Sequence, residues 1–329
     1  MTVHHVLRAV ENVRGVAVRT PILSAAAFNE RLGRTVWVKA ENQQLTGSFK
    51  MRGAYSALAA MDPARRSRGV ICASSGNHAL ALAQAARLFD VPAIVVVPED
   101  VPTVKKQMMG VLGACIVTYG RRTGRRDAVV HQLAHRHGMT IVPSADDAWV
   151  IAGAGTVAWE MIQEVPDLAA ILVPVGGGGL AAGTALAATG HPRLHVFGVE
   201  PAVADDTYRS FQAGERISIP PPVTIADGLG HAEPAALAFD INKRLLAGVV
   251  TVPEEAIAEA MAYLWRHYRL AAEPSGAVAF AGLLHAPERL PDGPVGVVLS
   301  GGNVDWSTYR HLLDTAMPRL ENDAPTVLH

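Results

Sequence analysis

A lysine follows a short polar turn in the segment Thr46-Gly-Ser-Phe-Lys50-Met-Arg-Gly-Ala54. Residues Met51 to Met61 have a helical composition, which places Lys50 at the start of a helix. The positive end of a helix dipole favours the neutral form of an amine, and a neutral amine is what forms a Schiff base with an aldehyde. Taken alone, the segment better fits an ordinary surface lysine on a helix.

A second polar segment, Cys72-Ala-Ser-Ser-Gly-Asn-His78, follows an apolar run and opens an Ala-rich stretch. In an open α/β sheet, ligands bind beyond the carboxyl ends of the strands, where free N–H groups and short hydroxyls can hold a carboxylate. The alternative is a simple helix cap made by Ser75 or Asn77.

Four glycines in a row occur in Pro174-Val-Gly-Gly-Gly-Gly-Leu180, after an apolar strand and before a helix rich in small residues. Such a turn can wrap an anion with its backbone N–H groups, and the helix dipole adds attraction, so a phosphate is the expected ligand. The segment has neither the spacing of a dinucleotide fingerprint nor the Lys-Ser/Thr ending of a P-loop. A purely structural turn is the alternative.

Two further segments lie at predicted strand ends. Leu299-Ser-Gly-Gly-Asn303 puts the Ser300 hydroxyl beyond one strand. Glu200-Pro-Ala-Val-Ala-Asp-Asp206 groups three carboxylates beyond another, where oxygen ligands suit a hard divalent cation. From spacing alone, solvated acids that cap the next helix are the preferred interpretation of the acidic segment.

The elements that must position these residues alternate along the chain. Apolar runs bounded by Gly or Pro predict buried strands, and Ala- and Leu-rich segments between them predict helices, which is typical of a doubly wound α/β protein. The predicted strands are 69–73, 93–97, 115–119, 170–175, 196–199 and 295–299, and the predicted helices are 51–61, 79–88, 125–137, 151–164, 180–188 and 254–268. The prolines within 218–223 predict a loop.

Composition limits the classes of function. A chain of 329 residues is expected to form two lobes, and a net charge of -1 provides no field for nucleic acid or an anionic membrane. The only cysteines, Cys72 and Cys115, lie in apolar runs, and the first residues lack a basic segment with an apolar core. No apolar run reaches the roughly 20 residues of a membrane helix. These features favour a cytoplasmic protein that acts on a small molecule.

The four motifs, in this order, resemble those of the serine racemase and threonine/serine dehydratase family of fold-type II pyridoxal-phosphate enzymes. The similarity runs from Thr20-Pro21 to Asn303. It implies two doubly wound open-sheet lobes, as in the tryptophan synthase β subunit, with pyridoxal 5′-phosphate in the cleft between them. The implied large domain is 1–62 with 147–329, and residues 63–146 form a small mobile domain. The family also implies a homodimer.

The resemblance assigns roles around the cofactor. Lys50 is the attachment lysine, Phe49 lies against the ring, Asn77 bonds the ring hydroxyl and Ser300 faces the pyridine nitrogen. A neutral hydroxyl there makes the ring a weaker electron sink than a carboxylate would, which favours β-elimination over transamination. The phosphate is assigned to Gly176, Gly177, Gly178 and Gly179, and Glu273, Gly301 and Gly228 are expected to line the site.

The resemblance also assigns the substrate and metal residues. Ser74, Ser75, Asn77 and His78 are expected to hold the substrate carboxylate, and Arg126 to reach it on closure, although a basic solvated loop is the alternative for Arg126. Ser75 matches the serine that works on the face opposite the lysine. Glu200, Ala204 and Asp206 match the positions at which serine racemases bind magnesium or calcium.

The implied activity is removal of water and then ammonia from L-threonine or L-serine. The alternatives are a serine or aspartate racemase, a 3-hydroxyaspartate dehydratase that would need an extra cationic contact, and a cofactor-binding protein without catalysis. The chain departs from the family pattern at Gly153-Ala-Gly-Thr156 and at Leu80. These departures leave the recognition of the substrate side chain open.

Overall fold

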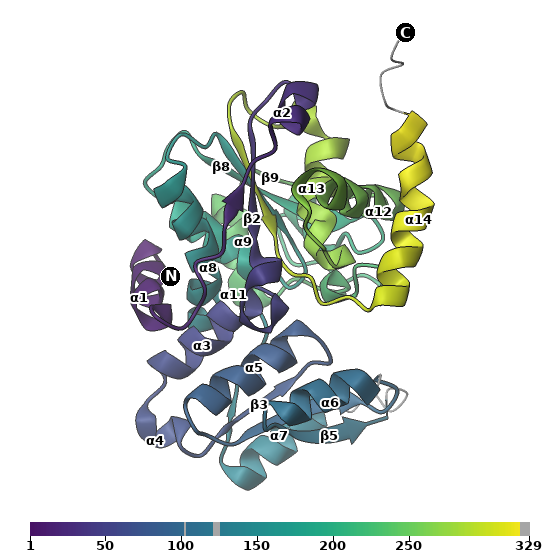
Figure 1. The fold of residues 1–329 in the computed structure, drawn as a ribbon. Helices are drawn as coiled ribbons and strands as arrows, with labels where there is room; N and C mark the ends of the chain where they lie inside the picture. The colour runs from purple at the N-terminus through teal and green to yellow at the C-terminus, as the bar shows by residue number, and fades with distance from the viewer. Residues whose placement is uncertain (102, 121–125, 323–329) are drawn as a thin grey trace, which may run out of the picture.

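The computed structural model describes residues 1–101, 103–120 and 126–322. The chain forms two β-sheets, each with helices on both faces, and the smaller sheet lies below the larger one in Figure 1. This arrangement confirms the predicted α/β fold.

The strands of the described chain belong to one six-stranded and one four-stranded sheet. Neighbouring strands are parallel, except that β1 is antiparallel to β2 at the edge of the larger sheet. The larger sheet has the order β1 (Ile22–Leu23), β2 (Val36–Ala40), β10 (Val295–Leu299), β7 (Ala170–Pro174), β8 (His195–Pro201) and β9 (Gly248–Val252). The smaller sheet has the order β5 (Cys115–Tyr119), β4 (Ala93–Pro98), β3 (Val70–Ala73) and β6 (Thr140–Ile141).

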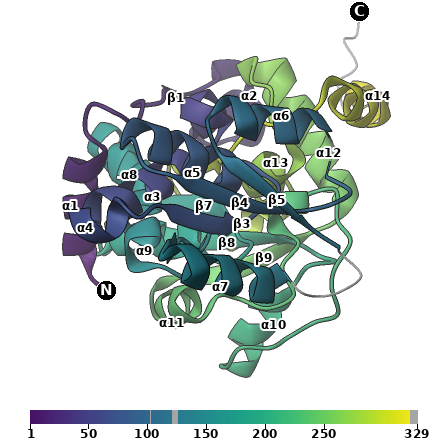
Figure 2. The same ribbon diagram turned by 90° about the horizontal axis from the view of Figure 1, so that it is seen from below.

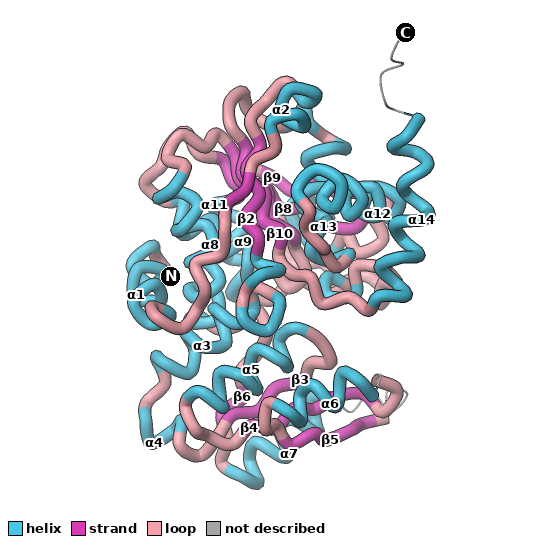
Figure 3. Tube along the Cα trace, viewed as in Figure 1, coloured by secondary structure: helices cyan, strands magenta, loops and turns pink. Residues whose placement is uncertain are grey.

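The helices connect these strands, and Figure 3 distinguishes them from the strands and loops. Their bounds are α1 (Val3–Val13), α2 (Ala26–Leu32), α3 (Lys50–Ala60), α4 (Pro63–Arg66), α5 (Asn77–Leu88), α6 (Thr103–Val111), α7 (Arg126–His137), α8 (Ala148–Glu164), α9 (Gly179–Ala188), α10 (Asp206–Ala213), α11 (Ala236–Leu245), α12 (Glu254–Tyr263), α13 (Pro274–His285) and α14 (Trp306–Asn322). Among the residues that the structure describes, no helix is both long and apolar enough to cross a membrane.

The larger sheet is buried on both faces because successive side chains of a strand point to opposite sides. Val295 and Val297 of β10 join the apolar cluster that includes α12 and α13, whereas Val298 joins the cluster of α8, α9 and α11. Alternate residues of this continuous apolar strand therefore belong to the two hydrophobic cores on the two faces of the sheet. The carboxyl end of β10 leads directly into Ser300.

The smaller sheet is also covered on both faces: in Figure 2, seen from below, α5 and α6 lie on one side of β3, β4 and β5, and α7 lies on the other. Val70 and Cys72 of β3 pack with α5, and Ile71 packs with α7. The prediction of a buried strand at 115–119 is wrong in part: β5 pairs with β4 at the sheet edge, and Cys115 is exposed. An edge strand has a neighbour on one side only, so its side chains are less covered.

The predicted helices and strands are present, with shifts of a few residues at their ends. The helix predicted at 254–268 is α-helical to Tyr263 and continues as a π-helix over Leu264–Tyr268. Residues 218–223 form a loop, as predicted. The sequence missed β1, β2, β6 and β9, of which β1 and β6 have only two residues each. The domain boundaries at 62/63 and 146/147 remain a prediction, although every strand of the smaller sheet lies within 70–141.

Candidate active site

The turn before α3 fixes the position of Lys50. Thr46 and Gly47 both have positive φ, at 62° and 73°, so the chain reverses just before the helix. The backbone N–H of Phe49 then donates to the Ser300 carbonyl at 3.0 Å, and Ser48 forms a β-bridge with Gly301. The first and last motifs of the sequence are thereby joined, with Lys50 as the first residue of α3.

The Lys50 amine points into the protein. Its Nζ donates to the Ser144 carbonyl at 3.0 Å and lies 4.9 Å from the centre of the Phe49 ring. Burial lowers the pKa of Lys50 from 10.5 to about 8, and the Glu273 carboxylate opposes this by raising it. The lowered pKa agrees with the chemistry that the sequence indicates, but burial is its main cause, in place of the helix dipole.

This pKa leads to a first prediction. A neutral amine is required to attack an aldehyde, so the rate at which cofactor-free protein captures pyridoxal phosphate should rise about tenfold per pH unit and level off above about pH 8. The rise in absorbance of the bound cofactor after rapid mixing measures this rate. Glu273→Gln removes the charge that raises the pKa and should move the plateau to lower pH. A rate that still climbs at pH 10 would contradict the prediction.

The glycine turn lies close to this amine. Ala145, next to the carbonyl that accepts from Lys50, packs on the turn, since a Cβ on Gly177 would lie 2.9 Å from the Ala145 methyl. Gly178 has a φ of 88°, which a side chain would strain. All four glycines, 176 to 179, are buried, and their N–H groups donate to no acceptor in the described chain. Buried N–H groups without acceptors fit an anion such as phosphate.

The second motif lies at the start of α5, and α5 packs against α3. Ser74, Ser75 and Asn77 are half-buried there, and the Ser74 hydroxyl accepts from the Gly76 N–H at 3.3 Å. Asn77 donates through Nδ2 to Glu273 Oε1 at 2.6 Å. Its Oδ1 accepts from Asn303 at 2.7 Å. The second and fourth motifs are therefore linked through side chains.

The His78 side chain does not have the role in carboxylate binding that its position in the motif indicates. Its ring is buried and Nε2 lies 2.9 Å from the Val142 carbonyl. Burial, together with the Lys50 charge, lowers the pKa of His78 to about 4, so the ring is neutral. A contact from His78 to a substrate carboxylate would thus come from its backbone N–H at the start of α5.

The remaining predicted residues lie around the glycine turn or at its edge. The Gly228 N–H donates to the Ser275 hydroxyl at 2.9 Å, and its carbonyl packs against Gly176. Arg126 is the first residue of α7, is exposed, and pairs through Nε with Asp127 at 2.9 Å. Its neighbours 121–125 in the basic run lie outside the described residues.

The sequence did not identify His231, which packs directly on the glycine turn. A Cβ on Gly176 would lie 2.9 Å from His231 Cδ2. Burial lowers the pKa of His231 to about 4, and the charges of Lys50 and Arg126 lower it further. The sequence signal that could have found it is its position three residues after Gly228, which the resemblance places at the site. Its role depends on a contact between segments more than fifty residues apart.

The acidic segment forms a separate buried cluster. Glu200 accepts hydrogen bonds from the N–H groups of Thr207 and Tyr208 at 3.2 and 2.8 Å. Both carboxylate oxygens of Asp206 are buried and have no hydrogen-bond partner in the described chain. Burial raises the pKa of Glu200 to about 8 and that of Asp206 to about 7, and the negative charge of Asp206 adds to the shift of Glu200.

Glu200 therefore caps the first turn of α10, whereas Asp206, a buried acid with two unpartnered oxygens, fits a ligand of a hard divalent cation. No group of three or more His, Cys, Asp or Glu side chains placed to hold a metal occurs in the described chain. Any further protein ligand here would come from another kind of oxygen, such as the carbonyl of the buried Ala204.

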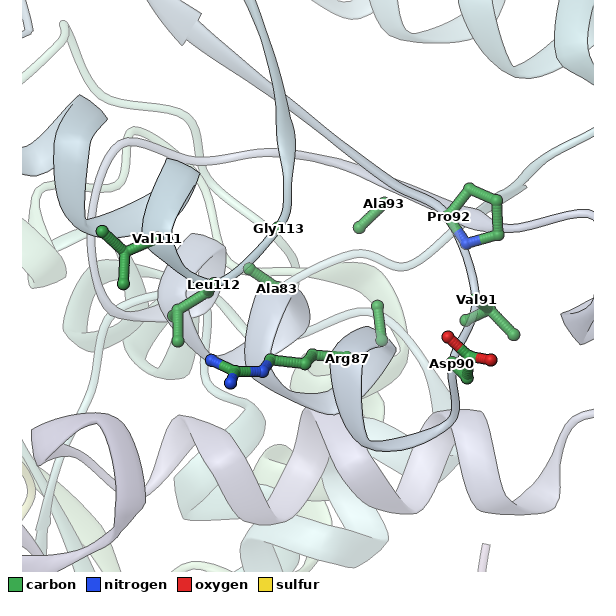
Figure 4. Close-up of a pocket in the computed structure, with 10 residues that line it drawn as sticks. Ala83, Arg87, Asp90, Val91, Pro92, Ala93, Val111, Leu112 and Gly113 are labelled. Atoms are coloured by element: carbon green, nitrogen blue, oxygen red, sulfur yellow. The ribbon is translucent and has the colours of Figure 1, made fainter.

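A pocket of about 420 Å³ lies at the opposite end of α5 from the motif (Figure 4). It is lined by Arg87 and Asp90 together with apolar residues such as Leu112, and no predicted site residue belongs to it. This pocket is therefore separate from the candidate active site, which lies at the amino end of α5.

Two α/β sheets, parallel except for the edge strand β1, with a lysine of lowered pKa near a buried glycine turn are typical of pyridoxal-phosphate enzymes of fold type II. The family model described as "Pyridoxal-phosphate dependent enzyme" matches residues 13–301, and the chain belongs to this family. The match spans the first three motifs and reaches Ser300 and Gly301 of the fourth, in agreement with the predicted family.

Different relatives are named for different activities. The chain is 40% identical over 323 residues to the L-threo-3-hydroxyaspartate ammonia-lyase of Saccharomyces cerevisiae, with 98% of each chain covered. Its structure is similar to that of serine racemase from Dictyostelium discoideum, with a TM-score of 0.88, 38% identity, and 93% and 99% of the two chains covered. It is equally similar to a threonine deaminase from T.th., with a TM-score of 0.88, 37% identity and the same coverage.

Proposed function

We propose that this chain catalyses β-elimination of water from a small 3-hydroxy amino acid, L-threonine, L-serine or 3-hydroxyaspartate, to give a 2-keto acid and ammonia. The observation that carries the proposal is the half-buried Lys50, whose amine donates to the Ser144 carbonyl, next to the residue that packs on the glycine turn, and has a pKa of about 8. The family membership supports the cofactor, and the relative named as a 3-hydroxyaspartate ammonia-lyase supports the reaction.

The chain's own groups have distinct tasks in this reaction. The N–H groups of Gly176 to Gly179 hold the phosphate, and the start of α5, with Ser74 and Ser75, holds the substrate carboxylate. Bound pyridoxal phosphate supplies an electron sink that makes the α-proton of the substrate acidic. Lys50 removes this proton, because its lowered pKa leaves a useful fraction of neutral amine near pH 8. Asn77, fixed by Glu273 and Asn303, would hold the hydroxyl of the cofactor ring, and Ser300 would hold its nitrogen.

Racemisation is the second candidate. Ser75 is half-buried, and no hydrogen bond joins its hydroxyl to the described chain, so the hydroxyl is free to carry a proton on the face opposite Lys50. The similarity to a structure named as a serine racemase agrees with this assignment. Proton return by Ser75 would compete with loss of the hydroxyl group.

A panel of serine, threonine and 3-hydroxyaspartate isomers tests the proposal. Keto acid formation, followed by a coupled dehydrogenase, is the expected result for at least one isomer, and chiral chromatography detects inversion in the same samples. Inversion without keto acid would establish the racemase in place of the lyase. Bound cofactor with neither reaction would overturn both proposals.

We also propose that Glu200, Ala204 and Asp206 bind Mg²⁺ or Ca²⁺, which should stabilise the fold by relieving the repulsion between two buried acids. Adding either cation to chelator-treated protein should raise the melting temperature by a few degrees, on the order of 1–3 kcal/mol of stability. Asp206→Asn should abolish this shift. Asp205→Asn, one residue away and paired with Arg209, should keep it. An equal shift in Asp206→Asn would contradict the site.

The homodimer and the cytoplasmic location stay predictions. The first rests on the family resemblance and the second on the cysteine content.

A further inference from the structure

The glycine turn is held from one side by helix α11. The N–H of Ala235, the residue before this helix, donates to the Gly177 carbonyl at 3.2 Å. Further along the helix, Nδ2 of Asn242 donates to the Gly178 carbonyl at 3.1 Å. A Cβ on Gly178 would lie 2.7 Å from this nitrogen and 3.3 Å from the Ala238 methyl. Positions 235, 238 and 242 have helical spacing, so one face of α11 packs on the turn.

Holding these carbonyls also sets the direction of the neighbouring N–H groups. In a trans peptide the C=O and the N–H point to opposite sides, and none of the described peptide bonds is cis. The Gly177 carbonyl shares its peptide unit with the Gly178 N–H, and the Gly178 carbonyl shares its unit with the Gly179 N–H. Carbonyls bonded to α11 therefore turn two N–H groups to the other side of the turn, where they can bind an anion.

Asn242 is an unfavourable residue for the core in which it lies. Its side chain is 1% exposed, and its Oδ1 has no hydrogen-bond partner in the described chain. A buried amide oxygen that accepts no hydrogen bond lowers the stability of a fold. Only the amide nitrogen can donate to a carbonyl, so the bond to Gly178 fixes the orientation of the side chain. A polar residue that breaks the packing rules in this way is expected where it serves a site.

We infer that Asn242 is a positioning residue for the cofactor phosphate. This inference rests on the proposed role of the glycine turn in holding that phosphate. The Asn242 amide fixes the Gly178 peptide, so the N–H groups of the turn are directed at the phosphate before it binds. Without the amide, Gly178, whose φ is 88°, has no side chain to limit rotation of its peptide, and the turn must be ordered when the phosphate binds.

Pyridoxal and pyridoxal phosphate isolate this effect, because both carry the aldehyde that Lys50 attacks and only one carries a phosphate. The absorbance of the bound ligand gives the affinity of cofactor-free protein for each. Asn242→Ala should weaken binding of pyridoxal phosphate by about tenfold and that of pyridoxal by less than about twofold. The ³¹P resonance of the bound cofactor should shift in this variant. The melting temperature without cofactor should change by less than about 4 °C, since the variant loses an unpaired oxygen together with a hydrogen bond.

Thr184→Val is the matched control. Thr184 is fully buried on α9, and its hydroxyl has no hydrogen-bond partner among the residues that the structure describes. The valine removes a buried, unpaired polar atom and leaves the bonds from α11 to the turn in place. This variant should bind both ligands like the original protein and give the same ³¹P resonance. Asn242→Leu, which keeps the branched shape of the side chain, provides the same comparison if Asn242→Ala does not fold.

Two outcomes would overturn the inference alone. One is a preference for pyridoxal phosphate over pyridoxal that stays unchanged in the Asn242 variants, and the other is equal weakening of both ligands, which would assign Asn242 to the fold. An original protein without any preference for pyridoxal phosphate would overturn the phosphate role of the turn as well. Failure of the proposed reaction gives a different result, namely no keto acid from any 3-hydroxy amino acid while the contrast between the two ligands persists.

Discussion

Replacing Lys50 with alanine should abolish covalent attachment of the cofactor and reduce keto acid formation by about 10³-fold or more, because one amine serves both as the attachment point and as the base. Borohydride treatment of the cofactor-loaded original protein, followed by proteolysis and mass spectrometry, should label Lys50 alone. The alanine variant should carry no label. Its thermal stability without cofactor should stay near that of the original protein, since the change removes only one side-chain hydrogen bond, to Ser144.

The other lysines provide the controls. Lys39 is fully buried, but its Nζ donates to the Thr20 carbonyl at 2.7 Å and to Glu160 at 2.6 Å. Lys106→Ala, on α6, should leave labelling and turnover unchanged. A borohydride label on Lys39, or full activity in Lys50→Ala, would remove the basis of the proposed function.

Arg52→Met should destabilise the protein by about 3–5 kcal/mol, because it leaves buried carboxylates without their main cation. Arg52 is fully buried and donates to both oxygens of Glu41 at 2.8 Å. It also donates to both oxygens of Glu160, at 2.7 and 3.0 Å. Denaturant unfolding measures the loss. Because Arg52 lies two residues after Lys50, it also ties the start of α3 to α8, which carries Glu160.

Arg65→Met is the matched control, since Arg65 is exposed on α4 and should change the free energy of unfolding by less than about 0.5 kcal/mol. A loss below about 1 kcal/mol in Arg52→Met would show that the network adds little to the stability of α3.

The candidate site could be predicted in part because its motifs are local. The four consecutive glycines at 176–179 indicate an anion site, because their backbone can turn its N–H groups toward a ligand. The position of Lys50 at a helix start indicates a reactive amine. The pairing of Asn77 with Glu273 joins residues almost two hundred positions apart, and no local pattern encodes it. The spacing of the acidic segment favoured acids that cap the next helix, and Glu200 does cap α10. The burial of Asp206 depends on its packing in the folded protein, so the spacing could not show it.

The sequence alone determined the alternation of strands and helices and the order of the four motifs, since apolar periodicity and glycine runs act over a few residues. Only the tertiary structure decided which distant groups meet. It placed Ser144 against the Lys50 amine, His231 on the glycine turn and Asp206 beside Glu200. The pKa values of these groups follow from burial, and burial is a property of the whole packed chain, which no short segment carries by itself.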